Sequence, residues 1–284
     1  LETPALQDKQ VLVKHEYMSL DPYMRGRMND GKSYTAPQAL NAVMVAGTVG
    51  EVVESRHPQF AVGDKVVGMG GWQTYSVVDA DMPAALRKID TTHVPISHFL
   101  GAVGMPGVTA WHGLVRIINP KAGQTLTVSA ASGAVGSAFG ALAKARGCRV
   151  VGFAGGKDKC DYVVKELGFD ACIDYKQHSD YLSLSKALKD ACPDGIDGHF
   201  ENVGGKVLQA VVPLLNTGAR VPVCGVIAWY NLTRLPEGPD LTPVLMRNIL
   251  TKRLKVQGFI VSDHYDRLGA FLLRAGDAGL GQSL

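Results

Sequence analysis

The sequence predicts an α/β protein of two domains, in which a parallel sheet with helices on both faces accompanies a smaller antiparallel β-barrel. Short alternating apolar runs separated by turns fill residues 1–95, whereas strand and helix patterns alternate over residues 96–260. The first pattern is typical of small barrels and the second of doubly wound parallel sheets. With 284 residues, the chain is long enough for two domains.

The predicted barrel strands are short and separated by turns. Their apolar runs are Val11–Val13, Gly47–Glu54 and Tyr75–Val78. Gly50 and Gly63 lie where a strand would bend or bulge, since glycine tolerates the kink. We therefore expect these runs to pair as antiparallel strands.

A glycine-rich turn marks the larger domain. Thr125–Ala130 has the pattern of a buried strand, and Ala131–Gly136 then fits G-x-G-x-x-G with alanine in the first glycine position. A helix with apolar residues at Ala138, Phe139, Leu142 and Ala145 follows, with Gly147 as its stop, and Arg149–Ala154 is the next strand. This βαβ context indicates a Rossmann dinucleotide site, in which bare backbone at Gly133 admits the pyrophosphate and the helix start attracts it.

The residues after the second strand predict which dinucleotide binds. Sites for NAD usually place Asp or Glu about 20 residues beyond the glycines, where it binds the ribose 2′-hydroxyl. Here Ala154–Lys159 contains Lys157 and Lys159 and no strand-end carboxylate. Two lysines suit a 2′-phosphate, so we expect NADPH. The alternative is that both lysines only solvate a loop.

Further strands are predicted along the chain at Ala171–Asp174, Gly198–Glu201, Arg220–Cys224 and Lys255–Ile260, with helices between them at Asp180–Ala191 and Lys206–Leu215. Right-handed crossovers place the carboxyl ends of such strands at one edge of the sheet, where ligands bind. Gly155, Asn202, Gly225 and Phe259 lie at or just past strand ends. We expect them to line one crevice that faces the barrel domain.

Composition excludes several classes of protein. The net charge of +3 gives no indication of a nucleic-acid partner, and no apolar run approaches the ~20 residues of a membrane span. The five cysteines are odd in number and form no C-x-x-C motif, which predicts a reduced, cytoplasmic protein. No cysteine has an evident base nearby, so thiol catalysis is disfavoured. The N-terminal residues are not a signal peptide. Because the sequence begins with Leu1 and not with methionine, we expect residues to precede it.

Several motifs together resemble a known family. Ser129–Gly136, Gly195–Asp197, Glu201–Gly205 and Cys224–Gly225 resemble the zinc-independent medium-chain dehydrogenase/reductases, and Leu20–Met28 and Gly104–Ala110 resemble their prostaglandin reductase, alkenal double-bond reductase and curcumin reductase group. The likeness runs from about residue 10 to about residue 274. It implies a GroES-like barrel, a Rossmann domain at 96–260, a homodimer, and NADPH-dependent reduction of the C=C bond of α,β-unsaturated ketones or aldehydes. In the family the chain then returns to the barrel, so residues 261–284 would join residues 1–95, although no closing strand is evident beyond about Arg274.

The resemblance also implies site residues. For the cofactor these are Gly133, Val135 and Gly136 at the pyrophosphate; Lys159 and Tyr175 at the 2′-phosphate or adenosine; Asn202, Cys224, Gly225 and Ile227 toward the nicotinamide; and Met105, Pro106, Thr109, Phe259 and Val261 around its ring and carboxamide. Gly155, at a predicted strand end, is a further candidate for cofactor binding. Core packing is the alternative for Ile227, Phe259 and Val261.

Two tyrosines are the candidate catalytic groups. Tyr230 follows a predicted strand end, which places it in a loop over the crevice, and in the family it matches an enolate stabiliser or proton donor. Tyr23 matches a substrate-pocket tyrosine of the barrel side. An enolate needs only a weak acid, so tyrosine or ribose hydroxyls suffice. Tyrosines are also common packing residues, which is the alternative for both.

The sequence lacks the ligand sets of zinc-dependent relatives. Those carry Gly-His-Glu before the barrel glycine turn and a four-cysteine lobe, whereas here Met44–Ala46 precede Gly47 and no cysteine precedes Cys148. Catalytic zinc needs about three such ligands and structural zinc four. We therefore expect no metal.

Two alternative functions remain open. A quinone oxidoreductase of the same superfamily would use the same cofactor site. A nucleotide-binding protein without catalysis is a second alternative, although no aromatic-basic stripe of the kind that binds RNA is evident.

Overall fold

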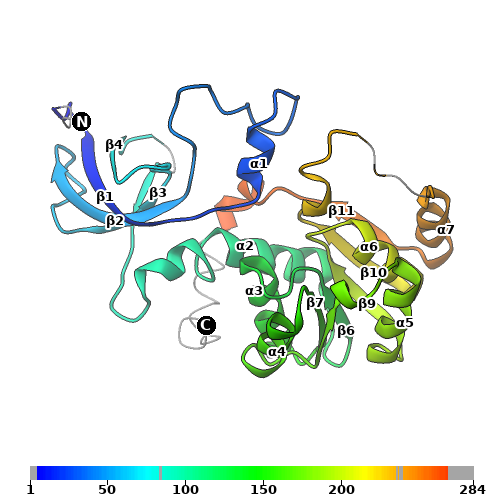
Figure 1. Cartoon of the computed structure of the whole chain (residues 1–284). Coiled ribbons are helices and arrows are strands. Elements are labelled where there is room, and N and C mark those ends of the chain that lie inside the picture. Colours follow the sequence, from blue (N-terminus) through cyan, green and yellow to red (C-terminus); the bar gives the residue numbers. More distant parts are fainter. Residues whose placement is uncertain (1–4, 83–84, 235, 237–238, 268–284) are drawn as a thin grey trace. The chain divides into compact units, whose positions relative to one another are not determined.

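The computed structural model describes residues 5–82, 85–234, 236 and 239–267 (Figure 1). The chain forms two compact units that divide between Gly104 and Met105. The domain limits inferred from the sequence, 1–95 and 96–260, stay a prediction. The expected return of the chain to the barrel falls mostly on residues 268–284, which lie outside the described residues.

The first unit is built on a five-stranded antiparallel sheet in the order β4-β1-β2-β3-β5. Its elements are β1 (Gln10–Met18), α1 (Tyr23–Arg27), β2 (Thr48–Ser55), β3 (Lys65–Gly68), β4 (Tyr75–Asp79), β5 (Leu86–Lys88) and the 3-10 helix η1 (Ile96–Leu100). The three apolar runs that predicted strands fall in β1, β2 and β4. The curled sheet confirms the predicted GroES-like architecture.

Glycine is required at position 50, where β2 lies against the backbone of β1. The register of β1 shifts between His15 and Tyr17, opposite Gly50, which is the signature of a β-bulge. A Cβ atom on Gly50 would overlap the carbonyl oxygen of Lys14. The predicted bend is therefore present, and its extra residue belongs to β1. Gly63, with φ +93°, forms the turn before β3.

The second unit is built on a six-stranded parallel sheet in the order β11-β10-β9-β6-β7-β8. The strands are β6 (Thr125–Val128), β7 (Arg149–Ala154), β8 (Ala171–Asp174), β9 (Ile196–Phe200), β10 (Leu215–Val223) and β11 (Lys255–Gly258). This is the strand order of a Rossmann fold, so the predicted fold class is confirmed.

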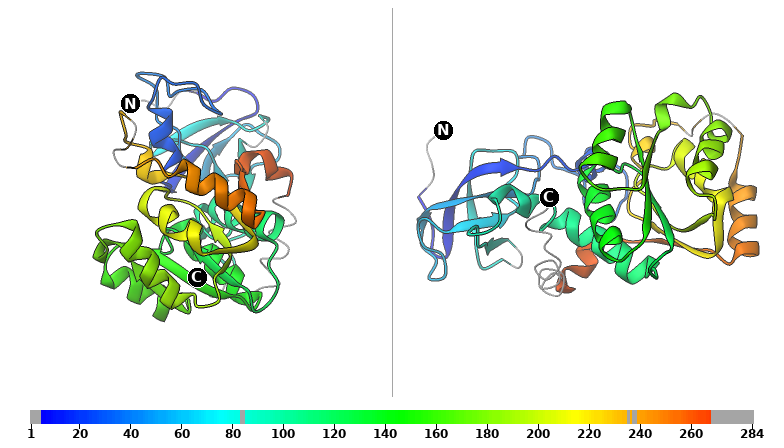
Figure 2. Two further views of the ribbon diagram at one scale, coloured as in Figure 1. Left: turned by 90° about the vertical axis from the view of Figure 1, so that its right-hand side faces the viewer. Right: turned by 90° about the horizontal axis from the view of Figure 1, so that it is seen from below.

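Helices lie on both faces of this sheet (Figure 2). They are α2 (Met105–His112), the π-helix η2 (Gly113–Ile118), α3 (Ala134–Ala145), α4 (Lys157–Lys165), η3 (Tyr175–Gln177), α5 (Tyr181–Ala191), α6 (Gly205–Val211), η4 (Val212–Leu214), η5 (Ile227–Trp229), α7 (Thr242–Lys252) and η6 (Val261–Arg267). Helix α2 packs against α3, and α5 packs against α6. Segment η6 packs against α2 of the second unit.

Two local interpretations need correction. The alternative that Lys157 and Lys159 only solvate a loop is wrong about the loop, because Gly156, with φ +103°, is the N-cap of α4 and the helix begins at Lys157. The predicted helix Lys206–Leu215 is instead α6 followed by the 3-10 turn η4, and Leu215 already belongs to β10.

The core of the second unit depends on close helix–sheet contact. Phe139 of α3 packs against Phe200 of β9 with ring centroids 4.9 Å apart, and both side chains are fully buried. On the same helix, a Cβ atom on Gly140 would overlap the ring of Phe169. Glycine at 140 therefore sets how closely α3 approaches its neighbours.

We expect Gly140→Ala to destabilise the protein. The methyl group would gain up to about 1 kcal/mol of helix propensity but would overpack the core at a cost of about 1–3 kcal/mol. Gly26→Ala, in α1, is the matched control, because nothing lies within 4 Å of the place that its new methyl group would take. Chemical denaturation followed by circular dichroism measures both variants, and a Gly140→Ala protein as stable as the control would contradict the packing argument.

Candidate functional site

The sheet of the second unit contains one point where the strand order reverses. Strands β6 and β9 are neighbours, although β7 and β8 lie between them in the sequence. Val128 at the end of β6 pairs with Phe200 at the end of β9. The loops that follow, 129–133 and 201–204, therefore begin side by side. Ligands of open α/β sheets bind at such a switch point.

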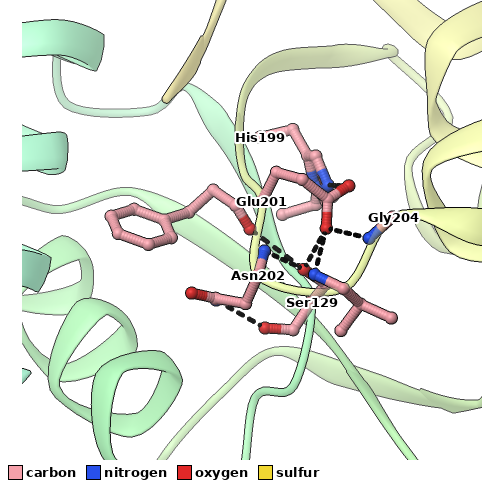
Figure 3. A network of polar contacts seen from close by, with 8 residues as sticks. Ser129, His199, Glu201, Asn202 and Gly204 are labelled. Carbon is pink, nitrogen blue, oxygen red and sulfur yellow. Dashed lines mark hydrogen bonds and ion pairs between the residues drawn. The ribbon is translucent and has the colours of Figure 1, made fainter. Parts of the chain in front are cut away.

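Ser129 ties these two loops together (Figure 3). Its hydroxyl donates to Glu201 Oε1 at 2.8 Å and accepts from the backbone N–H of Asn202 at 2.7 Å. The Asn202 side-chain amide donates to the Ser129 carbonyl at 2.9 Å. Among the described residues no donor bonds the Asn202 amide oxygen. That oxygen is therefore placed to accept a hydrogen bond from a ligand, as expected for a ribose or nicotinamide contact.

The glycine turn presents the start of α3 to the same point. Gly133 is the N-cap of α3, and no side chain caps that end among the residues described. A Cβ atom on Gly136 would overlap the Ala130 carbonyl, so glycine is required there for the helix to pack on its own turn. Val135 lies in the first helical turn and is half-buried. Free N–H groups and the helix dipole make this end suitable for a pyrophosphate.

The two lysines of α4 differ in their partners. Lys157 pairs with Asp161 at 2.6 Å, four residues along the helix. Lys159 has no ion-pair partner within the part of the chain that the structure describes, so its charge is available to a phosphate. This difference favours Lys159 over Lys157 as the 2′-phosphate ligand.

Tyr175 and Lys176 lie over Gly155. A Cβ atom on Gly155 would sit 3.0 Å from the Tyr175 hydroxyl and 2.9 Å from Lys176 Cε. Lys206 holds Tyr175 in place, since its Nζ donates to the Tyr175 carbonyl at 3.0 Å and lies 5.9 Å from the centroid of the Tyr175 ring. Tyr175, expected at the 2′-phosphate or adenosine, is therefore brought together with Gly155, which was expected to line the crevice at a strand end.

One carboxylate lies beside this region, at the end of β8. Asp174 Oδ1 accepts the N–H of Gly156 at 2.8 Å and that of Lys176 at 3.0 Å. The Gly156 hydrogen bond is the main cause that holds the pKa of Asp174 below its ordinary value. The negative charge of Asp174 is therefore bound by backbone N–H groups of the adjoining loop.

The loop after β10 carries the candidate proton donor. The Tyr230 hydroxyl accepts the N–H of Val226 at 3.2 Å and lies 3.0 Å from the position of a Cβ on Gly225. Since the hydroxyl accepts in that bond, its own proton is not used there. Ile227 is 46% exposed, so the core-packing alternative is wrong for this residue. Burial, with a contribution from Glu201, raises the pKa of Cys224 to about 12, so this thiol stays protonated.

The residues predicted around the nicotinamide ring lie on adjoining segments. Phe259 packs edge-on against Phe200, with centroids 6.2 Å apart, and also contacts His112 at 5.2 Å. Val261 begins η6 and is half-buried, as Phe259 is. Met105 begins α2, Pro106 is buried beside it, and the Thr109 hydroxyl donates to the Met105 carbonyl at 2.7 Å.

Tyr23 belongs to the first unit. It begins α1, its ring lies 5.8 Å from the Arg27 guanidinium carbon, and both residues border a small cavity of about 20 Å³, which is large enough for about one water molecule. The substrate-side role of Tyr23 stays a prediction.

Sequence reasoning missed a buried polar pair. His199 and Glu201 of the β9 end have no exposed surface, and His199 Nε2 lies 3.1 Å from Glu201 Oε2. The sequence did contain an indication of this pair. His199 and Glu201 are polar and flank Phe200 in a strand that was expected to be buried on both faces. Lys176, beside the predicted Tyr175, was also missed.

Metal and membrane features were searched over the described residues. In that part of the chain, no group of three or more His, Cys, Asp or Glu side chains is arranged to hold a metal ion. Nor does any helix there have the length and apolar character needed to cross a membrane.

Two family descriptions match the sequence. "N-terminal domain of oxidoreductase" matches residues 1–86, and "Zinc-binding dehydrogenase" matches residues 134–273.

Named proteins match over most of the chain. The NADPH-dependent curcumin reductase of Escherichia coli is 51% identical over 90% of this chain and 72% of its own length. The NADP(+)-dependent 2-alkenal reductase of Nicotiana tabacum is 44% identical over 90% of this chain and 72% of its own. The crystal structure of Vibrio vulnificus CurA in complex with NADPH superposes with a TM-score of 0.91, at 47% identity, over 99% of this chain and 82% of that one.

Proposed function

The chain belongs to the zinc-independent medium-chain dehydrogenase/reductases, in the group of curcumin, alkenal and prostaglandin reductases, and we propose that it reduces the C=C bond of α,β-unsaturated ketones or aldehydes with NADPH. The observation that carries this function is the switch point between β6 and β9. There an uncapped helix start, the Asn202 amide oxygen and the Tyr230 loop all belong to adjoining segments of one sheet edge.

The residues present fit this cofactor. The α3 N-terminus would bind the pyrophosphate through Gly133, Val135 and Gly136, and Lys159 with Tyr175 would bind the 2′-phosphate and adenosine. Asn202, Cys224, Gly225 and Ile227 would contact the nicotinamide half. Around its ring and carboxamide we place Met105, Pro106, Thr109, Phe259 and Val261, with Gly155 under the adenosine side.

The reaction divides into three requirements. Bound NADPH supplies the hydride for the β-carbon of the substrate. Tyr230 donates a hydrogen bond to the carbonyl oxygen, on which negative charge grows as the enolate forms. The same hydroxyl, or a ribose hydroxyl, is acidic enough to donate the proton that the α-carbon receives. Tyr23 is the second candidate for contact with the substrate.

We also propose a cytoplasmic homodimer. The five cysteines are all free thiols, which suits a reducing compartment. Strand β11 is at the end of the sheet order, so one of its edges has no neighbouring strand among the residues described, and an edge of this kind can pair with a second copy.

We expect the protein to oxidise NADPH when an enone or an enal such as 4-hydroxynonenal is added, and to do so faster than with a simple quinone. The absorbance of NADPH measures the rate, and the saturated carbonyl product identifies C=C reduction. Faster turnover of the quinone would favour the quinone oxidoreductase, and no turnover of any compound would favour a non-catalytic nucleotide-binding protein.

We expect Lys159→Ala to weaken NADPH binding about tenfold, the effect of one charge-assisted hydrogen bond, and to leave NADH binding unchanged. Lys157→Ala is the matched control, since its charge already pairs with Asp161. Fluorescence titration measures the affinities of the wild type and of both variants for NADPH and NADH. Equal losses in both variants, or equal wild-type affinity for NADPH and NADH, would contradict the 2′-phosphate assignment.

We expect Tyr230→Phe to lower kcat for an enone about 10²-fold, since it removes one donor to the developing enolate. NADPH affinity should hardly change, because the phenyl ring keeps its place in the loop. Steady-state kinetics and coenzyme titration separate the two effects. An unchanged kcat would remove Tyr230 from the mechanism.

A further inference from the structure

Glu201 lies at the centre of the buried polar pair and has four donors around it. Its Oε1 accepts from the Ser129 hydroxyl at 2.8 Å, from Val203 N–H at 2.6 Å and from Gly204 N–H at 2.9 Å. Its Oε2 faces His199 Nε2 at 3.1 Å. Ser129 directly follows β6, His199 lies near the end of β9, and Gly204 lies in the loop that follows β9 (Figure 3). A carboxylate with all its neighbours donating is bound more strongly than a neutral acceptor would be.

The protonation state of this centre follows from its donors. Burial opposes ionisation of Glu201, but His199 and the N–H groups of Gly204 and Val203 outweigh burial and hold the pKa of the carboxyl below its ordinary value. An ionised carboxylate can only accept, so His199 Nε2 carries the hydrogen. His199 Nδ1 lies 2.8 Å from the Thr127 hydroxyl, which fixes the ring from its other side.

The turn that Glu201 holds supports the loop of Tyr230. The carbonyl of Asn202 accepts Ile227 N–H at 3.2 Å, and the carbonyl of Val203 accepts Ala228 N–H at 3.0 Å. A Cβ on Gly204 would lie 3.1 Å from the Trp229 ring, so the loop also packs on the turn. The same turn carries Asn202, whose amide oxygen faces the proposed cofactor site.

We propose that Glu201, held by His199, is a positioning residue that fixes Asn202 and the Tyr230 loop in the arrangement that receives the nicotinamide half of the coenzyme. This inference rests on the proposed function. Neither side chain touches substrate or coenzyme, and both act through the turn 202–204. The Glu201 carboxylate accepts hydrogen bonds from the N–H groups of the turn. The carbonyl groups of the turn accept hydrogen bonds from the N–H groups of the Tyr230 loop.

Four single variants and one double variant, Glu201→Gln combined with His199→Leu, test the proposal. Glu201→Gln removes the charge with little change of shape, and His199→Leu removes the donor to Oε2. His199→Gln is the conservative variant, because its amide nitrogen can replace Nε2. Asp197→Asn is the control. Asp197 lies on the same strand and also binds a neighbouring strand, since it accepts the N–H of Thr125 at 2.9 Å. This contact is at the start of β9, whereas Glu201 follows its end.

We expect Glu201→Gln and His199→Leu to lower NADP⁺ and NADPH affinity and kcat/KM about 10- to 100-fold, the scale of a small misplacement of binding groups. His199→Gln should recover most of the loss, and the double variant should be no worse than Glu201→Gln alone, because His199 acts through Glu201. Asp197→Asn should lower the melting temperature without changing coenzyme affinity.

A pH profile of NADP⁺ affinity, normalised to the wild type, separates positioning from general damage. In the wild type the Glu201 contribution is lost only when the pH falls through a pKa below the ordinary glutamate range. Without His199 that pKa rises, so His199→Leu should begin to lose affinity at a higher pH than the wild type as the pH falls, while Glu201→Gln stays flat. Cys224 is the other titratable group beside Glu201, and burial keeps its thiol protonated at neutral and acidic pH.

Unchanged affinity and kcat/KM in Glu201→Gln would overturn the proposal. An equal loss in Asp197→Asn at a matched melting temperature would also overturn it, since the effect would then be general destabilisation. A wild type that binds coenzyme without reducing any enone would refute the proposed function alone, because the affinities still decide the role of Glu201. A wild type that binds neither NADPH nor NADP⁺ would refute both.

Discussion

The tie between Ser129 and Asn202 is the contact on which the candidate site depends. Parallel pairing of β6 and β9 brings the two strand ends together, but the loops beyond them leave the sheet and would be free to diverge. The Ser129 hydroxyl prevents this, because it accepts from the Asn202 N–H and donates to Glu201 in the same place. The glycine turn and the Asn202 turn therefore form one surface, with the uncapped start of α3 beside it.

Much of the fold could be predicted because its signals are local. Strand β8 has the predicted bounds, Ala171–Asp174, and α5 begins where Asp180 offers an N-cap carboxylate to Ser183 N–H. Gly147 ends α3 with φ +71°, as a helix stop requires. In each case the residues that determine the structure lie within a few positions of one another, so the sequence pattern contains the whole cause.

The features that the sequence did not predict depend on partners far along the chain. His199 and Glu201 bind Thr127 and Ser129, 72 residues away on another strand, and nothing near them in the sequence indicates those partners. The two lysines of α4 look equivalent as a pattern, yet the helix that begins at Lys157 places Asp161 one turn below it and leaves Lys159 without such a partner in the described chain. Tyr175 meets Gly155 only because β7 and β8 are parallel neighbours.

Two carboxylates beside a site for an anionic ligand would be expected to oppose binding. Asp174 and Glu201 avoid this because their oxygens accept backbone N–H groups of the loops themselves, those of Gly156 and Lys176 in one case and of Val203 and Gly204 in the other. The donors that neutralise each charge also fix the shape of each loop. Removing either side chain would therefore leave backbone donors unpaired as well, so the charge and the loop conformation in this site depend on the same hydrogen bonds.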